Sequence, residues 1–248
     1  MNPGAAQRQF DDAAATFDTA DFVIATTRQG LLQRLAPMTL EARFVVDLGA
    51  ATGSAVRALG RRFKHARIVA VDSSHNMLLQ AHTKKSWLSK SRYLQTEATA
   101  LPFADHSVDV IFANQLLPWL PDPLPVFAEV ARTLRKDGLF VFSTLGPDSL
   151  ANLRDEPFAD MHNVGDELVR AGLRDPVLDV DRLTVTYEST QSLLADCQAI
   201  GASHCVPDQT NVLALDFELI YGHCWGSGPR LAQGEFRVDA GDIGMHRR

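Results

Sequence analysis

A loop with two glycines follows a short, strongly apolar segment of the sequence. The segment RFVVDL runs into the loop DLGAATGS, residues 47–54, and a helical pattern comes next. Glycine is needed where the backbone takes positive φ or approaches a ligand closely, and the N-terminus of the next helix presents free N–H groups. Ligands of open α/β sheets bind at this end of a strand. The loop therefore predicts a site for a nucleotide-like cofactor.

Two cofactor classes compete for this loop. Dinucleotide-binding folds use G-x-G-x-x-G, whereas Ala51 and Ser54 stand at the second and third glycine positions here. The usual pattern for S-adenosylmethionine is D-x-G-x-G-x-G. The sequence matches that pattern at Asp47, Gly49 and Gly53 and replaces the middle glycine by Ala51. The loop favours S-adenosylmethionine and disfavours a nucleotide-dependent oxidoreductase.

Two carboxylates follow the next strand-like segments. Asp72 ends the segment RIVAVD, where a carboxylate can accept hydrogen bonds from both hydroxyls of a ribose. Its alternative role is to cap the following helix. Glu97 and Ala98 come after the third segment. There the carboxylate can accept a hydrogen bond from an adenine amino group while the backbone contacts the ring edge, or Glu97 is simply an exposed loop residue.

An alternation of apolar segments and amphipathic stretches must position these residues, and it is typical of βαβ units. Strands are predicted at residues 43–48, 67–71, 92–95, 108–113, 139–144, 183–187 and 213–221. Helices are predicted at about 54–63, 74–85, 123–135, 163–171 and 189–200. Lys136, Asp137 and Gly138 should end the third of these helices. Because the better strands are apolar on both faces, we expect an α/β fold with a doubly wound, seven-stranded, mostly parallel sheet.

The chain divides into three predicted parts. Residues 1–40 should form an N-terminal helical cover with one or two helices. Residues 41–225 should form the cofactor-binding domain, and the glycine-rich residues 226–248 a loose C-terminal tail.

Composition restricts the class of protein. The 248 residues include 24 Lys plus Arg and 30 Asp plus Glu, so the net charge is −6 and nucleic acid or an anionic membrane is a poor partner. No segment approaches the roughly 18 apolar residues that span a bilayer. Cys197, Cys205 and Cys224 form no C-x-x-C pair, which predicts reduced thiols and no metal site. We therefore expect a cytoplasmic protein.

Longer segments carry a family resemblance. In order, DLGAATG, VDSSHNML, EATALPFADHSVDVIFAN and LRKDGLFVFST resemble the successive motifs of class I S-adenosylmethionine-dependent methyltransferases. Within that superfamily, AAATFD, ANQLLPW, FSTLGPDSL, DMHNVGDEL, LTVTY and FELIYGHCW are most similar to the malonyl-carrier-protein O-methyltransferases of biotin synthesis. The likeness runs from about residue 8 to residue 226. Assembly factors of respiratory complex I form a related branch with similar late segments.

The resemblance implies a Rossmann-like fold and S-adenosylmethionine as the cofactor. The implied cofactor-binding residues are Asp47, Gly49, Ala51, Gly53, Asp72, Met77, Glu97, Ala98 and Asn114.

Three residues are candidates for the methyl-transfer step. Asn114 follows the fourth strand, near the expected methyl group, and would orient the acceptor or line the cofactor pocket; otherwise it is a turn residue. The aromatic face of Trp119 suits a sulfonium cation, although it could simply pack. His162 could donate a hydrogen bond to a carboxylate or ester oxygen, or be structural.

The implied reaction is O-methylation of the free carboxylate of a malonyl thioester on acyl carrier protein. A carboxylate with a pKa near roughly 4 is ionised at neutral pH, so no general base is required. The alternatives are a non-catalytic assembly protein and a methyltransferase of another small molecule. An acidic carrier needs a basic docking face. The cluster between Arg57 and Arg67 is predicted to lie opposite the cofactor, which leaves Arg8, Arg28 and Arg154 as docking residues.

Overall fold

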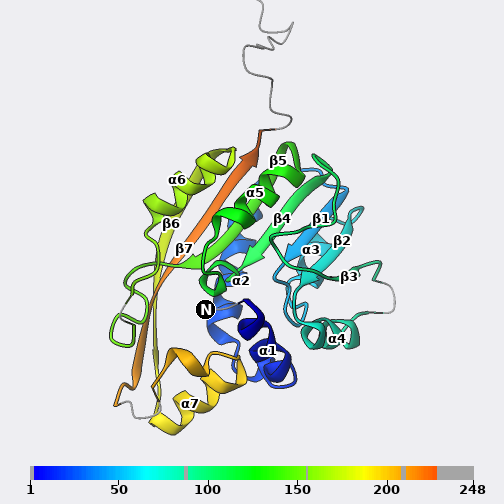
Figure 1. Cartoon of the computed structure of the whole chain (residues 1–248). Coiled ribbons are helices and arrows are strands. Elements are labelled where there is room, and N and C mark those ends of the chain that lie inside the picture. Colours follow the sequence, from blue (N-terminus) through cyan, green and yellow to red (C-terminus); the bar gives the residue numbers. More distant parts are fainter. Residues whose placement is uncertain (1–2, 87–88, 155, 208–210, 228–248) are drawn as a thin grey trace, which may run out of the picture.

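A mixed seven-stranded sheet forms the centre of the computed structural model, which describes residues 3–86, 89–154, 156–207 and 211–227 (Figure 1). The sheet order is β3-β2-β1-β4-β5-β7-β6, with β7 antiparallel to both of its neighbours. The strands are β1 (Phe44–Leu48), β2 (Arg67–Asp72), β3 (Arg92–Gln95), β4 (Val108–Asn114), β5 (Leu134–Leu145), β6 (Leu173–Thr186) and β7 (Ala214–Gly226). The predicted doubly wound α/β fold is confirmed.

Helices cover both faces of this sheet, which explains why the central strands are apolar throughout. The α-helices are α1 (Pro3–Ala13), α2 (Phe22–Leu35), α3 (Val56–Arg62), α4 (His75–Thr83), α5 (Leu124–Thr133), α6 (Met161–Ala171) and α7 (Thr190–Ala199). The described residues also form the short 3-10 helices η1 (Phe17–Thr19), η2 (Leu117–Trp119) and η3 (Ser203–Cys205). In β1, Val46 packs in the core under α5 and α6, while its neighbour Val45 packs under α2 and α3.

Two predicted boundaries are wrong. Helix α5 ends at Thr133, and the predicted helix end Lys136-Asp137-Gly138 lies within β5. Leu134 is fully buried and pairs with Val108 of β4, so tertiary packing overrides the local helix-stop signal. The sixth strand begins at residue 173 rather than 183. Exposed polar residues alternate along this edge strand, so its early part lacks the apolar run expected of a buried strand.

The two N-terminal helices contact the rest of the fold in different places. Helix α2 belongs to the core, where Leu31 and Leu35 are buried against the sheet. Helix α1 is joined to α4 through Asp11, which accepts hydrogen bonds from Ser74 Oγ at 2.6 Å and from the Asn76 N–H at 3.0 Å. These two contacts bring α1 to the ends of the strands.

Three further predictions concern the C-terminal segment, membrane spans and metal sites. The predicted tail from residue 226 lies, from residue 228 onward, outside the described residues, and Gly226 itself ends β7. No helix among the described residues is long and apolar enough to cross a membrane. Within the same residues there is no group of three or more His, Cys, Asp or Glu side chains that could hold a metal ion.

Candidate active site

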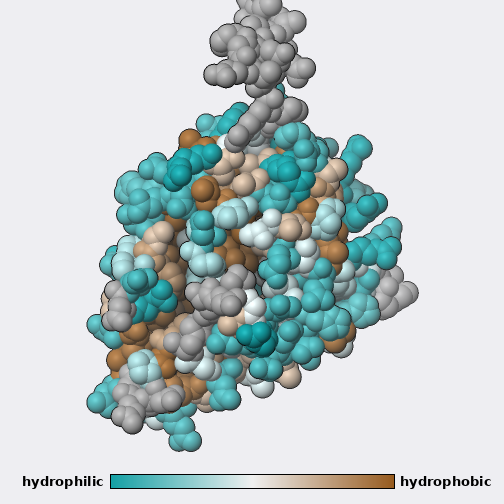
Figure 2. All heavy atoms as spheres, viewed as in Figure 1, coloured by the Kyte–Doolittle hydropathy of each residue, from teal (hydrophilic) through white to brown (hydrophobic). Residues whose placement is uncertain are grey.

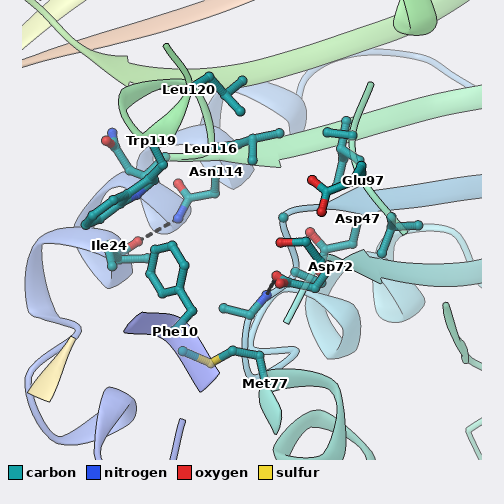
Figure 3. Close-up of a pocket in the computed structure, with 18 of the residues that line it drawn as sticks. Phe10, Ile24, Asp47, Asp72, Met77, Glu97, Asn114, Leu116, Trp119 and Leu120 are labelled. Carbon is teal, nitrogen blue, oxygen red and sulfur yellow. Dashed lines mark hydrogen bonds between the residues drawn. The ribbon is translucent and has the colours of Figure 1, made fainter. Parts of the chain in front are cut away.

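A cavity of about 480 Å³ lies at the carboxyl edge of the sheet. Its walls come from the 47–54 loop, the ends of β2 and β4, the segment after β3, η2 and the N-terminal helices (Figure 3). The volume is typical of sites for small molecules and cofactors. Parallel strands that end at one edge have brought together polar residues that are far apart in the sequence.

The loop after β1 takes the left-handed conformation three times, at Gly49 (φ 72°), Ala51 (φ 44°) and Gly53 (φ 73°). Gly49 and Ala51 line the cavity, as predicted, and Gly53 does not. A Cβ on Gly53 would lie 2.9 Å from the Cβ of Ala81 in α4. Gly53 is therefore required for packing against α4, and the structure places this predicted cofactor-binding residue outside the cavity lining.

Ala51 stands where the pattern has a glycine, and the structure accommodates it. Its N–H donates to Asp72 Oδ2 at 2.8 Å, which ties the loop to the end of β2. Its methyl group packs beside Phe17 and Met77, at the edge of a small apolar cluster under the N-terminal helices. The left-handed backbone at this alanine is thus held by the hydrogen bond to Asp72 and by packing against this cluster.

Asp72 lines the cavity and does not cap α4. The cap is Ser74, whose Oγ accepts a hydrogen bond from the Met77 N–H. The two carboxylate oxygens of Asp72 accept the N–H groups of Ser74 at 2.9 Å and Ala51 at 2.8 Å. Burial raises the pKa of Asp72 to about 6, against the lowering effect of these two bonds. A neutral hydrogen-bond donor from a ligand would favour the ionised form.

Asp47 is the most deeply buried acid of the cavity, with 2% of its surface exposed. Its Oδ2 has no hydrogen-bond partner among the described residues. Burial raises the pKa of Asp47 to about 7; the charge of Asp72 also raises it and Arg28 lowers it. Arg28, which pairs with Asp21 at 3.3 Å, is the one Lys or Arg among the described residues that line the cavity. The cavity thus presents an unsatisfied carboxylate and a cation in the same region.

Aromatic residues form the opposite wall. The rings of Phe10 and Trp119 meet edge to face with their centroids 4.7 Å apart, and Phe17 and Ile24 extend this wall. In Figure 3, Trp119 and Phe10 lie on one side of the cavity, and Asp47, Asp72 and Glu97 lie on the other. Ala98 also lines the cavity, and Met77, which does too, is buried beneath it.

Asn114 lines the cavity at the end of β4, but its amide is already engaged. Its Nδ2 donates to the Ile24 carbonyl at 2.9 Å, and its Oδ1 accepts a hydrogen bond from Ser143 Oγ at 2.9 Å. Asn114 therefore joins α2 to the sheet and places Ile24 at the cavity wall. This arrangement indicates a positioning role.

His162 is not brought to the cavity. It lies in the first turn of α6, its side chain is 84% exposed, and its backbone N–H donates to the N-cap residue Asp160. His162 is not among the residues that line the cavity, so the structure does not support its predicted catalytic role. Conversely, sequence reasoning missed Phe10 and Ile24 and placed Arg28 at a docking surface, because no motif marks these residues in the N-terminal helices.

Comparison with known proteins places this fold and cavity in a class. A family described as "Methyltransferase domain" matches residues 46–142. The malonyl-[acyl-carrier protein] O-methyltransferase of Halorhodospira halophila is 33% identical over all of both chains. A protein of the same name from Coxiella burnetii is 33% identical, covering 92% of this chain and 89% of the relative.

Solved structures show the same fold at low sequence identity. Bacillus subtilis YcgJ has a TM-score of 0.63 at 18% identity and covers 82% of this chain and 99% of its own. A methyltransferase in complex with the Haloferax volcanii Trm112 activator has a TM-score of 0.66 at 19% identity, covering 92% of this chain and 100% of its own.

The fold and cavity define a class I S-adenosylmethionine-dependent methyltransferase. Within that class, the chain belongs to the family of the malonyl-[acyl-carrier protein] O-methyltransferases. The cavity fits the cofactor of the class, since the unpartnered, buried Oδ2 of Asp47 is an acceptor that an ammonium group would satisfy.

Proposed function

We propose that this enzyme methylates the free carboxylate of a malonyl thioester carried by acyl carrier protein. The observation that carries the proposal is the chemistry of the cavity wall. Among the described residues that line it, there is no His, Lys, Cys or Tyr side chain, so its possible proton acceptors are carboxylates. Asp47, Asp72 and Glu97 lie across the cavity from the aromatic wall, and the fourth, Asp122, is exposed. An amine, phenol or guanidine acceptor must lose a proton during methylation, whereas a carboxylate is already ionised. The names of the relatives support the same acceptor.

The carboxylate side of the cavity would hold the cofactor. Asp72 would accept the ribose hydroxyls, and Glu97 with the backbone at Ala98 would contact the adenine. Asp47 would accept the ammonium group of the amino-acid end, and Arg28 would contact its carboxylate. These two side chains match a zwitterion, since one is an acceptor without a partner and the other is a cation that shares its charge with Asp21 over a distance of 3.3 Å.

The aromatic side would hold the acceptor. S-adenosylmethionine supplies a methyl group on a positively charged sulfonium sulfur. Phe10 and Trp119 exclude water there and present aromatic groups, which attract cations. Asn114 keeps Ile24 at this wall through its amide. The enzyme's contribution is alignment of acceptor and methyl group rather than proton transfer.

The test is transfer of a labelled methyl group to a malonyl thioester on acyl carrier protein, with free malonate and a succinyl thioester as controls. We expect a methyl ester on the malonyl carrier. At saturating S-adenosylmethionine, kcat should not change between pH 6 and pH 8, because Asp47 and Asp72 act in binding and the acceptor stays ionised. If S-adenosylhomocysteine binds but no carrier is methylated, the proposed acceptor is wrong.

A further inference from the structure

A groove between α3 and α4 is lined by positive charges. Its volume is about 360 Å³, and Arg57 and Arg61 of α3 face Lys84 and Lys85 at the end of α4. No carboxylate occurs among the described residues that line this groove.

The positive charge continues into a second hollow of about 690 Å³, at the amino-terminal ends of β1, β2 and β3. The two hollows share Lys85 and Ser89, and the described lining of the second also lacks carboxylates. Together they define a basic band made of Arg28, Arg43, Arg57, Arg61, Arg67, Lys84, Lys85, Lys90 and Arg92. In a chain of net charge −6, nine of the 24 Lys and Arg residues gather here without an acid in the lining.

Ion pairs among the described residues account for only two of these nine cations, since Lys84 pairs with Asp18 and Arg28 pairs with Asp21. Arg57 and Arg61 are exposed, one helical turn apart, and neither forms an ion pair within the described part of the chain. Like charges at this spacing destabilise a helix slightly. Arg132 shows the contrast, because it pairs with both Asp105 and Glu129 and so joins α5 to a neighbouring loop. Arg57 and Arg61 are therefore available to an external anion.

The band reaches the active site, contrary to the sequence prediction. The groove shares Arg28 and Ser54 with the cofactor cavity. Helix α3 starts directly after the glycine loop, so Arg57 lies close to the carboxyl edge of the sheet, while Arg67 lies at the opposite edge where β2 begins. The cluster that was predicted to lie wholly opposite the cofactor extends between the two edges.

We propose that the basic band is the docking surface for an acidic carrier protein, which delivers its thioester-bound acceptor beside the cofactor cavity. This inference rests on the proposed function. A protein partner fits better than single-stranded nucleic acid, which usually stacks its bases on exposed aromatic rings. In the described lining of the band, Tyr93 already contacts Lys85 and His82, and Phe44 already packs against Phe103. His65 is the third ring there.

The test compares two charge-reversal variants with equal change in net charge. The first is Arg57→Glu with Arg61→Glu, in the band. The control is Lys136→Glu with Arg170→Glu, at exposed positions outside it. Binding of fluorescently labelled malonyl acyl carrier protein is measured by anisotropy without S-adenosylmethionine, at 50 and 200 mM salt. Turnover is measured with the malonyl carrier and with malonyl-pantetheine, a small thioester without the protein.

We expect the band variant to weaken carrier binding at least about tenfold at low salt, and the control to change it less than about twofold. For the band variant, kcat/KM should fall with the carrier and stay unchanged with malonyl-pantetheine. Equal losses in both double variants, or equal losses with both substrates, would overturn the docking surface. So would tighter binding of a single-stranded RNA that displaces the carrier.

The carrier-binding measurement separates this inference from the proposed function. If no malonyl thioester is methylated, the proposed function fails, but carrier binding that depends on Arg57 and Arg61 would still support the band. If malonyl-pantetheine and the malonyl carrier are both methylated, and the affinity for the carrier is the same in the wild type and in the band variant, only the docking inference fails. Should the glutamate variant fold poorly by thermal unfolding, Arg57→Gln with Arg61→Gln gives the same comparison with neutral side chains.

Discussion

Replacing Asp72 by Asn tests the cofactor side of the cavity most directly. The two carboxylate oxygens accept the N–H groups of Ala51 and Ser74, at 2.8 and 2.9 Å. Each oxygen has a second lone pair, so the carboxylate can also accept two ribose hydroxyls. An asparagine side chain has the same shape as aspartate but only one oxygen. Its NH2 group would face the backbone N–H that donates to the second carboxylate oxygen in the wild type.

The expected loss follows from these contacts. A hydrogen bond to a charged acceptor contributes about 1.5–3 kcal/mol. Asp72→Asn removes one such bond to the ribose and the charge behind the other. We expect the affinity for S-adenosylhomocysteine to weaken by about 2–3 kcal/mol, which is about 30- to 140-fold.

The assay is calorimetric titration with S-adenosylhomocysteine and its 2′,3′-dideoxy analogue at pH 8. The analogue should bind the wild type weakly and lose little more in Asp72→Asn, because both changes remove the same contacts. The wild-type affinity should also increase between pH 5 and pH 7, since the pKa of Asp72 is about 6 and its ionised form accepts the hydroxyls.

A matched control is available in the same sheet. Asp109 is buried away from the cavity, and its Oδ2 accepts two backbone N–H groups, those of Arg43 and Phe44. Its Oδ1 pairs with Arg135 at 2.8 Å. Asp109→Asn should lower stability and leave the affinity for S-adenosylhomocysteine unchanged. The assignment of Asp72 to the ribose is refuted if Asp72→Asn binds S-adenosylhomocysteine as tightly as the wild type does. It is also refuted if removal of the two hydroxyls weakens binding by the same factor in both proteins.

Four further changes have defined outcomes. Ala51→Gly should increase the free energy of unfolding by about 1 kcal/mol, because it relieves a left-handed alanine. A lower free energy of unfolding, measured with urea, would show that the packing of the methyl group contributes more than the backbone strain. Arg28→Met should weaken the affinity for S-adenosylhomocysteine about tenfold or more. The affinity for 5′-methylthioadenosine, which lacks the amino-acid end, should stay unchanged in calorimetry. Equal losses of affinity for the two ligands would contradict the contact between Arg28 and the carboxylate of the cofactor. Asn114→Ala should lower kcat more than cofactor affinity, since it releases α2; a loss confined to cofactor affinity would place Asn114 in the cofactor site instead. The pKa values of Asp47 and Asp72, about 7 and about 6, exceed their usual value, so their contribution to ligand-free stability is present below pH 4 and lost as pH rises to 7. Between pH 5.5 and pH 8, the free energy of unfolding, measured with urea, should therefore decrease less in Asp47→Asn than in the wild type. An equal decrease would contradict the raised pKa of Asp47.

The sheet was predictable where local pattern and tertiary environment agree. Strands β1, β2 and β4 are buried on both faces, so each reads as an apolar run, and the order of the parallel strands follows from the βαβ alternation. Edge strand β6 alternates exposed residues over most of its length, and only its last part was recognised. The start of β5 was missed because its residues carry a helix-stop signal that pairing with β4 overrides.

The distribution of hydrophobic and charged residues over the surface was not predictable from local sequence patterns either. In Figure 2, hydrophobic residues gather over the region of β6, β7 and α7, and hydrophilic residues cover much of the rest of this face. Such a distribution depends on which side of each strand faces solvent. Likewise, the charges of Arg57 and Arg61 are plain in the sequence, but only the packing of α3 beside α4 makes them one wall of a groove next to the cofactor cavity.

By itself, the sequence determined the class of protein and the carboxylate half of its site. The loop at 47–54, Asp72 and Glu97 each follow a strand directly, and parallel strands end at one edge, so local order was sufficient to bring them together. The aromatic half was decided by tertiary structure. Phe10, Ile24 and Arg28 reach the cavity because Asp11 bonds to Ser74 and Asn114 bonds to the Ile24 carbonyl, contacts between residues more than 60 positions apart that no local pattern encodes.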